Sequence, residues 1–297
     1  MQEPTLDWDS LAEGREFPAA SIVLDDASID AYLEATGERH PLYARDAGGG
    51  LAPPLFTTMV RFVKASLGGR WPSGTIQLDH QVSMRRALRR GENLSLETRC
   101  GRVDVFKGRP RFEILSTLRD ADGAVAGAQS SASLWGGAPP PPAARVNGPD
   151  HSPDHAAGSA TNGELQASAD EVADEAAALG PVTDSYPMAR VRAFGEIALA
   201  LDPIHVDTEF AQSTRFGANI VQGRLAMTLL SRLMLQHQGS RWLNGGHLDV
   251  RFVRPVRVGE AISAWALPMA GRPRAFRVWC ENANHQRVIE GEAGIGP

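Results

Sequence analysis

The sequence is poor in cysteine, with only two among its 297 residues, Cys100 and Cys280. Neither stands in a CxxC or similar spacing that would indicate a metal site, and both lie in strand-like sequence, so we expect two buried free thiols. The chain also lacks the GxGxxG, Walker, HExxH and GxSxG motifs that mark dinucleotide, nucleotide, zinc and hydrolase sites. Nothing in the sequence demands a cofactor, and we expect none, whether nicotinamide, nucleotide or metal.

Long apolar runs and an excess of basic charge are missing as well. The formal net charge is -5, which gives no sign of a nucleic-acid partner. No run is long enough to span a bilayer, and the N-terminus lacks the basic and apolar segments of a signal peptide. Hydrophobic residues make up 42% of the chain and charged residues 22%, as in packed globular proteins. We expect a soluble cytoplasmic protein without nucleic-acid or membrane partners.

An internal repeat is the strongest pattern in the chain. Residues 82–99 (VSMRRALRRGENLSLETR) match residues 250–267 (VRFVRPVRVGEAISAWAL), and each segment carries Gly-Glu followed by alternating apolar and polar residues. Further on, GRPRFEIL from Gly108 matches GRPRAFRV from Gly271. Because the order and spacing recur over more than a hundred residues, a duplicated domain is the best explanation.

The repeats define a domain organisation and a fold class. We expect one repeat in residues 1–136, a linker rich in proline, glycine and alanine in residues 137–180, and a second repeat in residues 181–297. Each repeat contains an apolar helix, expected from Pro54 in the first and from Gly223 in the second, followed by alternating strands typical of an antiparallel sheet. The second helix is apolar nearly all round and must be wrapped by other elements. One central helix inside a curled sheet, twice over, is an α+β fold.

The segment DPIHVDTEFAQSTRFGANIVQG, residues 202–223, resembles the signature of the MaoC-like (R)-specific enoyl-CoA hydratases. That signature reads G-D-x-N-P-x-H-x-D, then an alanine, a phenylalanine-glycine pair and a terminal H-G. The matching residues are Pro203, His205, Asp207, Ala211, Phe216, Gly217 and Gly223. The resemblance implies a double hot-dog fold whose N-terminal repeat is degenerate.

The resemblance also implies an activity and a catalytic pair. In the family, an aspartate and a histidine five positions apart hold a water that adds to an α,β-unsaturated acyl-CoA, or they run the dehydration. His205 falls on the histidine position, whereas Ala200 stands where the aspartate is expected. The equivalent positions of the first repeat are Glu38 and Tyr43.

Elementary chemistry suggests a role for two residues of the signature, His205 and Gly223. His205 is the expected general base because imidazole titrates near neutrality, and the alternative is a bend histidine bonded to the backbone. Gly223 begins the apolar helix, so its free N–H can stabilise an enolate oxygen and the missing side chain permits close approach. The alternative for Gly223 is a glycine needed only for tight packing.

Neighbouring polar residues offer substitutes for the missing carboxylate. Asp202 could act as the acid or orient His205, but an aspartate before proline is also ordinary turn chemistry. Gln222 is expected at the rim of the pocket, where it shapes the rim or orients a water. Glu196 and Glu38 are further candidates for the acid, and Tyr43 could meet a substrate enclosed between the repeats.

Two other side-chain roles are expected. Asp207 should cap the following helix rather than touch substrate. Arginines with a geometry suited to the phosphates of CoA are Arg85, Arg86, Arg251 and Arg254, with none favoured over the others.

The leading functional prediction is therefore a hydratase or dehydratase acting on an enoyl or 3-hydroxyacyl thioester of CoA or acyl carrier protein. The alternatives are a thioesterase on the same fold, and an impaired subunit that binds acyl-CoA or partners an active chain. Further assembly as a homodimer or a hetero-oligomer is compatible with either interpretation.

Overall fold

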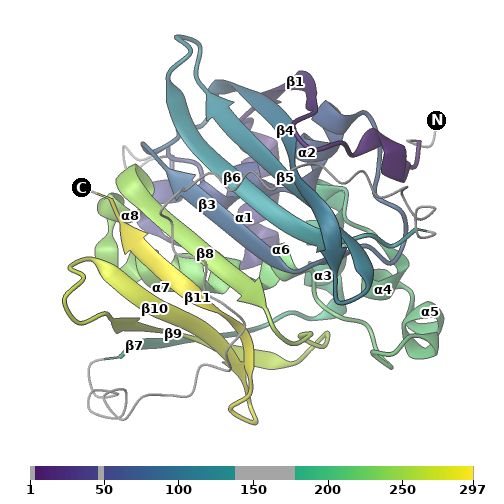
Figure 1. Cartoon of the computed structure of the whole chain (residues 1–297). Helices are drawn as coiled ribbons and strands as arrows, with labels where there is room; N and C mark the ends of the chain where they lie inside the picture. Colours follow the sequence, from purple (N-terminus) through teal and green to yellow (C-terminus); the bar gives the residue numbers. More distant parts are fainter. Residues whose placement is uncertain (1–3, 46–49, 138–177, 297) are drawn as a thin grey trace.

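A computed structural model describes residues 4–45, 50–137 and 178–296. Its strands form one 11-stranded sheet in the order β1-β4-β5-β6-β3-β8-β11-β10-β9-β7, with β2 paired to β6 outside this path (Figure 1). All the strand pairs are antiparallel. The predicted linker, residues 137–180, lies almost wholly outside the described residues.

The first half contains the elements that precede the linker. Its strands are β1 (Glu16–Val23), β2 (Ile76–Gln77), β3 (Asp79–Met84), β4 (Asn93–Phe106), β5 (Arg109–Arg119) and β6 (Val125–Leu134). Its helices are α1 (Asp26–Thr36) and α2 (Val60–Leu67), with short 3-10 turns η1 (Trp8–Ser10), η2 (Pro41–Tyr43) and η3 (Pro54–Thr58).

The second half repeats this plan with more helices. Its strands are β7 (Leu179–Ser185), β8 (Gly246–Phe252), β9 (Ala261–Pro268), β10 (Ala275–Asn282) and β11 (Arg287–Ile295). Its helices are α3 (Met188–Ala198), α4 (Pro203–Val206), α5 (Thr208–Ser213), α6 (Gly223–Ala226), α7 (Thr228–Gln238) and α8 (Ser240–Gly245).

The strand order shows how the two halves are related. Reading outward from the centre, the first half places β3, β6, β5, β4 and β1, and the second places β8, β11, β10, β9 and β7. These are equivalent strands in mirrored order, so the repeat seen in the sequence forms an internal pseudo-dimer. The halves join where β3 pairs with β8, in a register that sets Val82 opposite Leu248.

Turn glycines account for the recurring sequence matches. Gly91 and Gly259 precede the equivalent strands β4 and β9, with φ of 76° and 83°. Gly108 and Gly271, with φ of 76° and 70°, stand in the turns that lead into β5 and β10. Glycine adopts this left-handed region without the steric cost that a Cβ would add.

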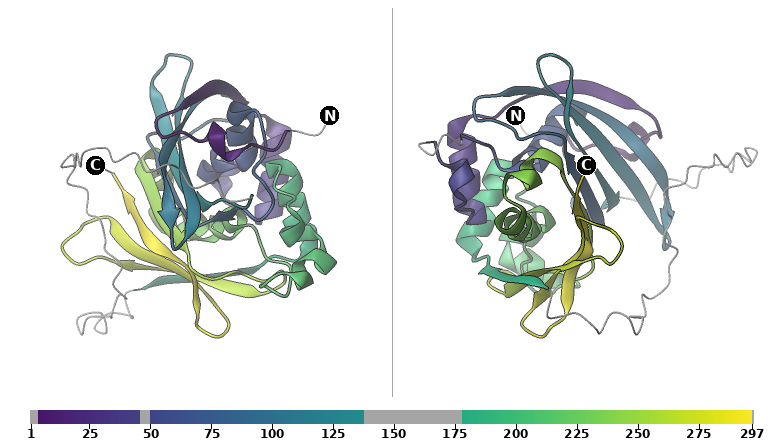
Figure 2. Two further views of the ribbon diagram at one scale, coloured as in Figure 1. Left: turned by 45° about the vertical axis from the view of Figure 1, so that its right-hand side comes forward. Right: turned by 90° about the vertical axis from the view of Figure 1, so that its left-hand side faces the viewer.

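The helices lie inside the curl of the sheet, as the prediction of a wrapped apolar helix requires (Figure 2). In the second half, the side chains of this helix that are fully buried, with no exposed surface, are Leu225, Met227, Leu229, Leu230, Leu233 and Met234. Burial of these large apolar side chains supplies much of the hydrophobic stabilisation of this half.

The prediction of one uninterrupted helix in each half is wrong. The first run breaks at Met59, whose ψ of 137° is extended, so a 3-10 turn precedes α2. In that turn the hydroxyls of Thr57 and Thr58 donate to the carbonyls of Pro54 and Leu55, a local bonding that competes with α-helix. The second run breaks at Met227, where α6 ends and α7 begins.

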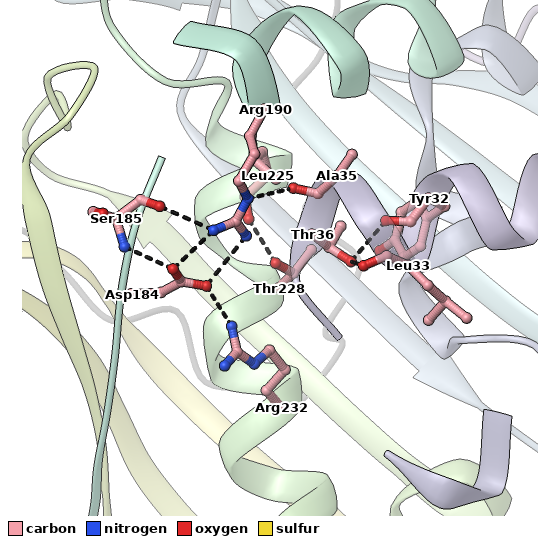
Figure 3. A network of polar contacts seen from close by, with 10 residues as sticks. All are labelled: Tyr32, Leu33, Ala35, Thr36, Asp184, Ser185, Arg190, Leu225, Thr228 and Arg232. Atoms are coloured by element: carbon pink, nitrogen blue, oxygen red, sulfur yellow. Dashed lines mark hydrogen bonds and ion pairs between the residues drawn. The ribbon is translucent and has the colours of Figure 1, made fainter. Parts of the chain in front are cut away.

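A partly buried ion network ties the helices of the two halves together (Figure 3). Asp184 at the end of β7 accepts hydrogen bonds from Arg190 of α3 and Arg232 of α7. Arg190 also donates to the carbonyl of Ala35 in α1, at 2.9 Å. Burial alone would raise the pKa of Asp184, but the two guanidinium groups outweigh it and hold that pKa below its usual value. Arg190 therefore links the first half of the chain to the second.

Two expectations from composition can be compared with this fold. Cys100 and Cys280 are buried free thiols, as predicted, and burial raises the pKa of both. In the part of the chain that the structure describes, no helix is both long enough and apolar enough to cross a bilayer.

Candidate active site

A cavity of about 420 Å³ opens between the two halves of the molecule. The second half contributes the end of α3, the 200–226 segment and residues 252–256 after β8. The first half contributes α2, residues 71–78 and parts of β5 and β6. A second hollow, about 730 Å³, follows β1, β3–β6 and β8 and contains none of the predicted site residues.

His205 lies in the short helix α4 and forms part of the cavity wall. Its Nδ1 is 2.8 Å from the carbonyl oxygen of Ile220. Because a carbonyl can only accept, the proton is on Nδ1, and Nε2 is left with its lone pair. Among the described residues Nε2 has no hydrogen-bond partner. The backbone bond and the cavity position, predicted as alternatives for His205, therefore occur together.

The protonation of His205 is set by burial and by one carboxylate. Burial lowers the pKa of this imidazole below its ordinary value, while the bond to Ile220 and the charge of Asp202 act in the opposite direction. A lowered pKa keeps the ring neutral at neutral pH, which is the state a general base needs.

The chain before His205 turns sharply and brings two positions to the cavity wall. α3 ends at Ala198, its C-cap Leu199 has a left-handed φ of 53°, and the partly buried Ala200 follows in the cavity wall. Asp202 is exposed, also lines the cavity, and occupies the N-cap position of α4. Its side chain makes no capping bond there, so the predicted turn role is confined to the backbone.

Gln222 lies deeper than the predicted rim, since only 4% of it is exposed. Its Nε2 donates to the carbonyls of Val191 and Ala200, at 3.0 and 3.2 Å. Its Oε1 is buried and has no hydrogen-bond partner. The side-chain amide of Gln222 thus holds α3 against the start of α6, and its Oε1 remains as an unused hydrogen-bond acceptor.

Gly223 is tightly packed, as one of its two predicted interpretations requires, and its role as an oxyanion donor stays a prediction. A Cβ at this position would lie 3.0 Å from the ring of Phe252, so the site is tightly packed. Within the described residues, the N–H of Gly223 donates no hydrogen bond, as expected at the first position of a helix. α6 itself has only four residues before the break at Met227, so the individual N–H rather than a long helix dipole is what this position offers.

Arg224 is a cavity residue that the sequence pattern did not reveal. Its guanidinium donates to the carbonyl of Thr58 and approaches Oε1 of Gln77 at 3.4 Å, both in the first half. Burial lowers its pKa to about 10. A charged residue at the second position of an otherwise apolar helix is the signal that could have drawn attention to it.

Other predicted candidates do not line the cavity. Glu196 is exposed on α3, and Glu38 and Tyr43 are buried in the first half. Asp207 caps α5 by accepting from the N–H of Phe210 at 3.0 Å, which confirms its predicted role.

The arginines considered for phosphate contacts are placed differently from one another. Arg86 pairs with Glu92 and Asp120, and Arg251 pairs with Glu290. Of the four candidates only Arg254 lines the cavity, and it is exposed. For the described ranges, no group of three or more His, Cys, Asp or Glu side chains is arranged to hold a metal ion.

Comparison with known families gives this site a context. Residues 173–273, which include the cavity wall around His205 and Gly223, match the family model of the MaoC like domain. Over these residues the chain is similar to that family. The (R)-specific enoyl-CoA hydratase of Rhodospirillum rubrum is 29% identical over 109 residues, which cover 34% of this chain and 73% of the hydratase. The predicted resemblance to the MaoC-like family is thereby confirmed.

Solved structures show a similar fold over nearly the whole chain. A MaoC-like dehydratase from Phytophthora capsici has a TM-score of 0.69 at 16% identity, covering 98% of this chain and 99% of its own. A conserved hypothetical protein of Mycobacterium tuberculosis, described as a double hotdog fold, has a TM-score of 0.65 at 16% identity, with 97% of both chains covered. The predicted α+β double hot-dog fold is confirmed.

Proposed function

We propose that this MaoC-like protein is a hydratase or dehydratase acting on an enoyl or 3-hydroxyacyl thioester, with acyl-CoA as the carrier to test first. The observation that carries the proposal is the state of His205, whose Nδ1 bonds to Ile220 and whose Nε2, in the wall of the cavity, has no hydrogen-bond partner among the described residues. The N–H of Gly223 belongs to the same wall. A base and a hydrogen-bond donor around one cavity are what hydration of a conjugated thioester requires.

The hydration follows from these two groups. Nε2 of His205 takes a proton from water as the oxygen adds to the β carbon of the enoyl thioester. Electrons move onto the thioester oxygen, where the N–H of Gly223 stabilises the developing charge. The imidazolium then returns a proton to the α carbon, so water has been added across the double bond. Dehydration is the same path in reverse.

Asp202 supports the charged form of His205 in this scheme. Its carboxylate raises the pKa of the imidazole, against the effect of burial, and so stabilises the imidazolium between the two proton transfers. Ala200 stands five positions before His205, where the family signature has an aspartate, so this position supplies no acid. Turnover through one base should therefore be slower than with a complete pair, because acid–base groups each contribute about 100- to 10,000-fold.

The test is hydration of a panel of trans-2-enoyl-CoAs, followed at the enoyl absorbance. His205→Ala should reduce turnover about 100-fold or more. Ala200→Asp, which places a carboxylate five positions before His205, should raise it. Unchanged turnover in His205→Ala would contradict the proposal, and CoA-ester binding by the variant is the control for folding.

A second function, an acyl-CoA-binding or partner subunit, is favoured by one observation, the alanine at position 200. Such a protein would bind enoyl-CoA saturably and hydrate none of the panel. In that case Ala200→Asp would be the decisive variant, because a gain of turnover would show that the site lacks only its acid. Release of free thiol from saturated acyl-CoA would instead indicate a thioesterase.

A further inference from the structure

The guanidinium of Arg224 is the most unusual charge in the cavity. It lies in the cavity wall, one residue beyond Gly223. Its hydrogen-bond acceptors are both neutral, the carbonyl of Thr58 and the side-chain oxygen of Gln77. A guanidinium has five N–H donors in a planar fork, so most of this donor capacity is unused.

No carboxylate of the described residues pairs with Arg224. Burial is the single influence on its pKa, which falls to about 10, whereas a nearby Asp or Glu would raise it. Arg224 is partly buried, and a partly desolvated charge without a counter-charge carries a cost that a bound anion would offset. The buried His80 supplies no counter-charge, because burial and the charge of Arg224 both lower the pKa of its imidazole.

The first half supplies further hydrogen-bonding groups to the cavity that contains Arg224. Ser131 and Ser133 line it from the inner face of β6, the face from which Gln129 donates to Thr57. Their hydroxyls make no side-chain hydrogen bond within the described part of the chain. The side chain of Gln77, opposite Ser133 across the β2–β6 pairing, also lines the cavity. These groups are suited to binding the oxygens of an anion rather than a hydrocarbon chain.

The position of Arg224 identifies which anion of a CoA thioester it could meet. Gly223, the proposed donor to the thioester oxygen, is its direct neighbour in the chain. The phosphates of CoA lie a whole pantetheine arm away from the thioester. An anion held by Arg224 must therefore belong to the acyl group.

Resting on the proposed function, we infer that Arg224 binds a carboxylate on the acyl chain, so that the substrate is the monothioester of a dicarboxylic acid. Arg224 would form a charge-assisted pair with that carboxylate, and Ser131 and Ser133 would complete its hydrogen bonds. The thioester end would then lie at His205 and Gly223. This assigns a substrate class and a specificity residue to the cavity.

The inference can be tested by binding alone, without turnover. Saturated CoA esters are compared in pairs of equal chain length: succinyl-CoA with butyryl-CoA, glutaryl-CoA with valeryl-CoA, and adipyl-CoA with hexanoyl-CoA. Wild type should bind the dicarboxylic member of at least one pair about tenfold tighter or more, the scale of one charged hydrogen bond in a buried site. Tighter binding of the neutral member in every pair would overturn the inference.

Variants of Arg224 separate charge from packing. Arg224→Met should lose the preference for the dicarboxylic ester and retain binding of its neutral partner, whereas Arg224→Lys should keep part of the preference. If Arg224→Met keeps the full preference, the inference is wrong. Retained binding of the neutral ester shows that the variant is folded. If Arg224→Met binds neither ester, the inference is tested instead by the preference of wild type for the dicarboxylic ester and by the part of that preference that Arg224→Lys keeps.

Arg254→Met is the matched control, since Arg254 also lines the cavity but is exposed. Any effect on phosphate contacts should change the affinity of both members of a pair by the same factor. The proposed function can fail independently of the inference about Arg224. It fails when no enoyl-CoA is hydrated although saturated CoA esters bind. Equal affinity within every pair, together with hydration of neutral enoyl-CoAs, would remove only the inference about Arg224.

Discussion

At the scale of single residues, the proposed site rests on a histidine, a glycine N–H and one nearby carboxylate. His205 and Gly223 keep their places in the cavity wall, and Asp202 lies three positions before the histidine rather than five. The charge of Asp202 still reaches the imidazole, because it raises the pKa that burial lowers. How far this carboxylate replaces the missing one can be measured through the protonation of His205.

The pH dependence of hydration reports that protonation. The base works as the neutral imidazole, so kcat/KM should rise with pH and level off once His205 is deprotonated. Because burial lowers the pKa of His205 from 6.5, the midpoint of this rise should lie below that value. Asp202→Asn removes the charge that raises the pKa, so its midpoint should move to lower pH still. A midpoint that moves upward would show that Asp202 does not act through His205.

The sequence predicted the residues of the signature but not Arg224. His205 and Gly223 stand within one continuous segment whose spacing can be compared directly with the family pattern. Arg224 depends on Thr58 and Gln77, which lie 166 and 147 residues away in the chain. Local periodicity cannot show that two segments distant in the chain will surround a charged side chain. The contacts of Arg224 can therefore be identified only from the folded structure.

At the scale of elements, the sequence predicted the repeat, the wrapped helix and the antiparallel strands. It did not predict the helix breaks, which arise from local hydrogen bonding.

The environment of Glu38 depends on tertiary contacts. Glu38 follows the C-cap of α1, and both carboxyl oxygens are buried. Burial raises its pKa to about 7, against the influence of Tyr43 and of Arg232 in α7. The acid expected as a candidate catalyst is instead a buried group of the helix layer.

Glu38 should make the stability of the protein fall as pH rises. Its pKa is near 4.5 when unfolded and about 7 when folded, so the folded state holds the proton more tightly and loses stability between these values. Glu38→Gln removes this loss. Urea unfolding should show the variant more stable by about 3 kcal/mol above pH 8 and by much less near pH 5.

The exposed Glu196→Gln in α3 is the control for this measurement. In Glu196→Gln, the difference in unfolding free energy between high and low pH should be the same as in wild type. A Glu38→Gln protein that is less stable than wild type above pH 8 would show that the ionised carboxylate is stabilised in the fold.

At the scale of the whole molecule, the two halves share one sheet, one ion network and one cavity. β3 and β8 pair across the centre, and Arg190 connects α3 to the carbonyl of Ala35 in α1. The lysine and arginine of α2 add to this contact, since Arg61 and Lys64 donate to the last carbonyls of α3. Cationic side chains at a helix C-terminus are stabilising, so each half completes a helix of the other.

These shared contacts predict that the halves unfold together. The two buried thiols are natural reporters, because Cys100 lies in β4 of the first half and Cys280 in β10 of the second. Burial raises the pKa of both, which protects them from alkylation in the folded state. Short pulses of a thiol reagent across a urea series, read by peptide mass spectrometry, should label both cysteines with the same midpoint. Labelling of Cys100 at lower urea would mean that the first half opens alone and that the cavity can lose one wall while His205 stays folded.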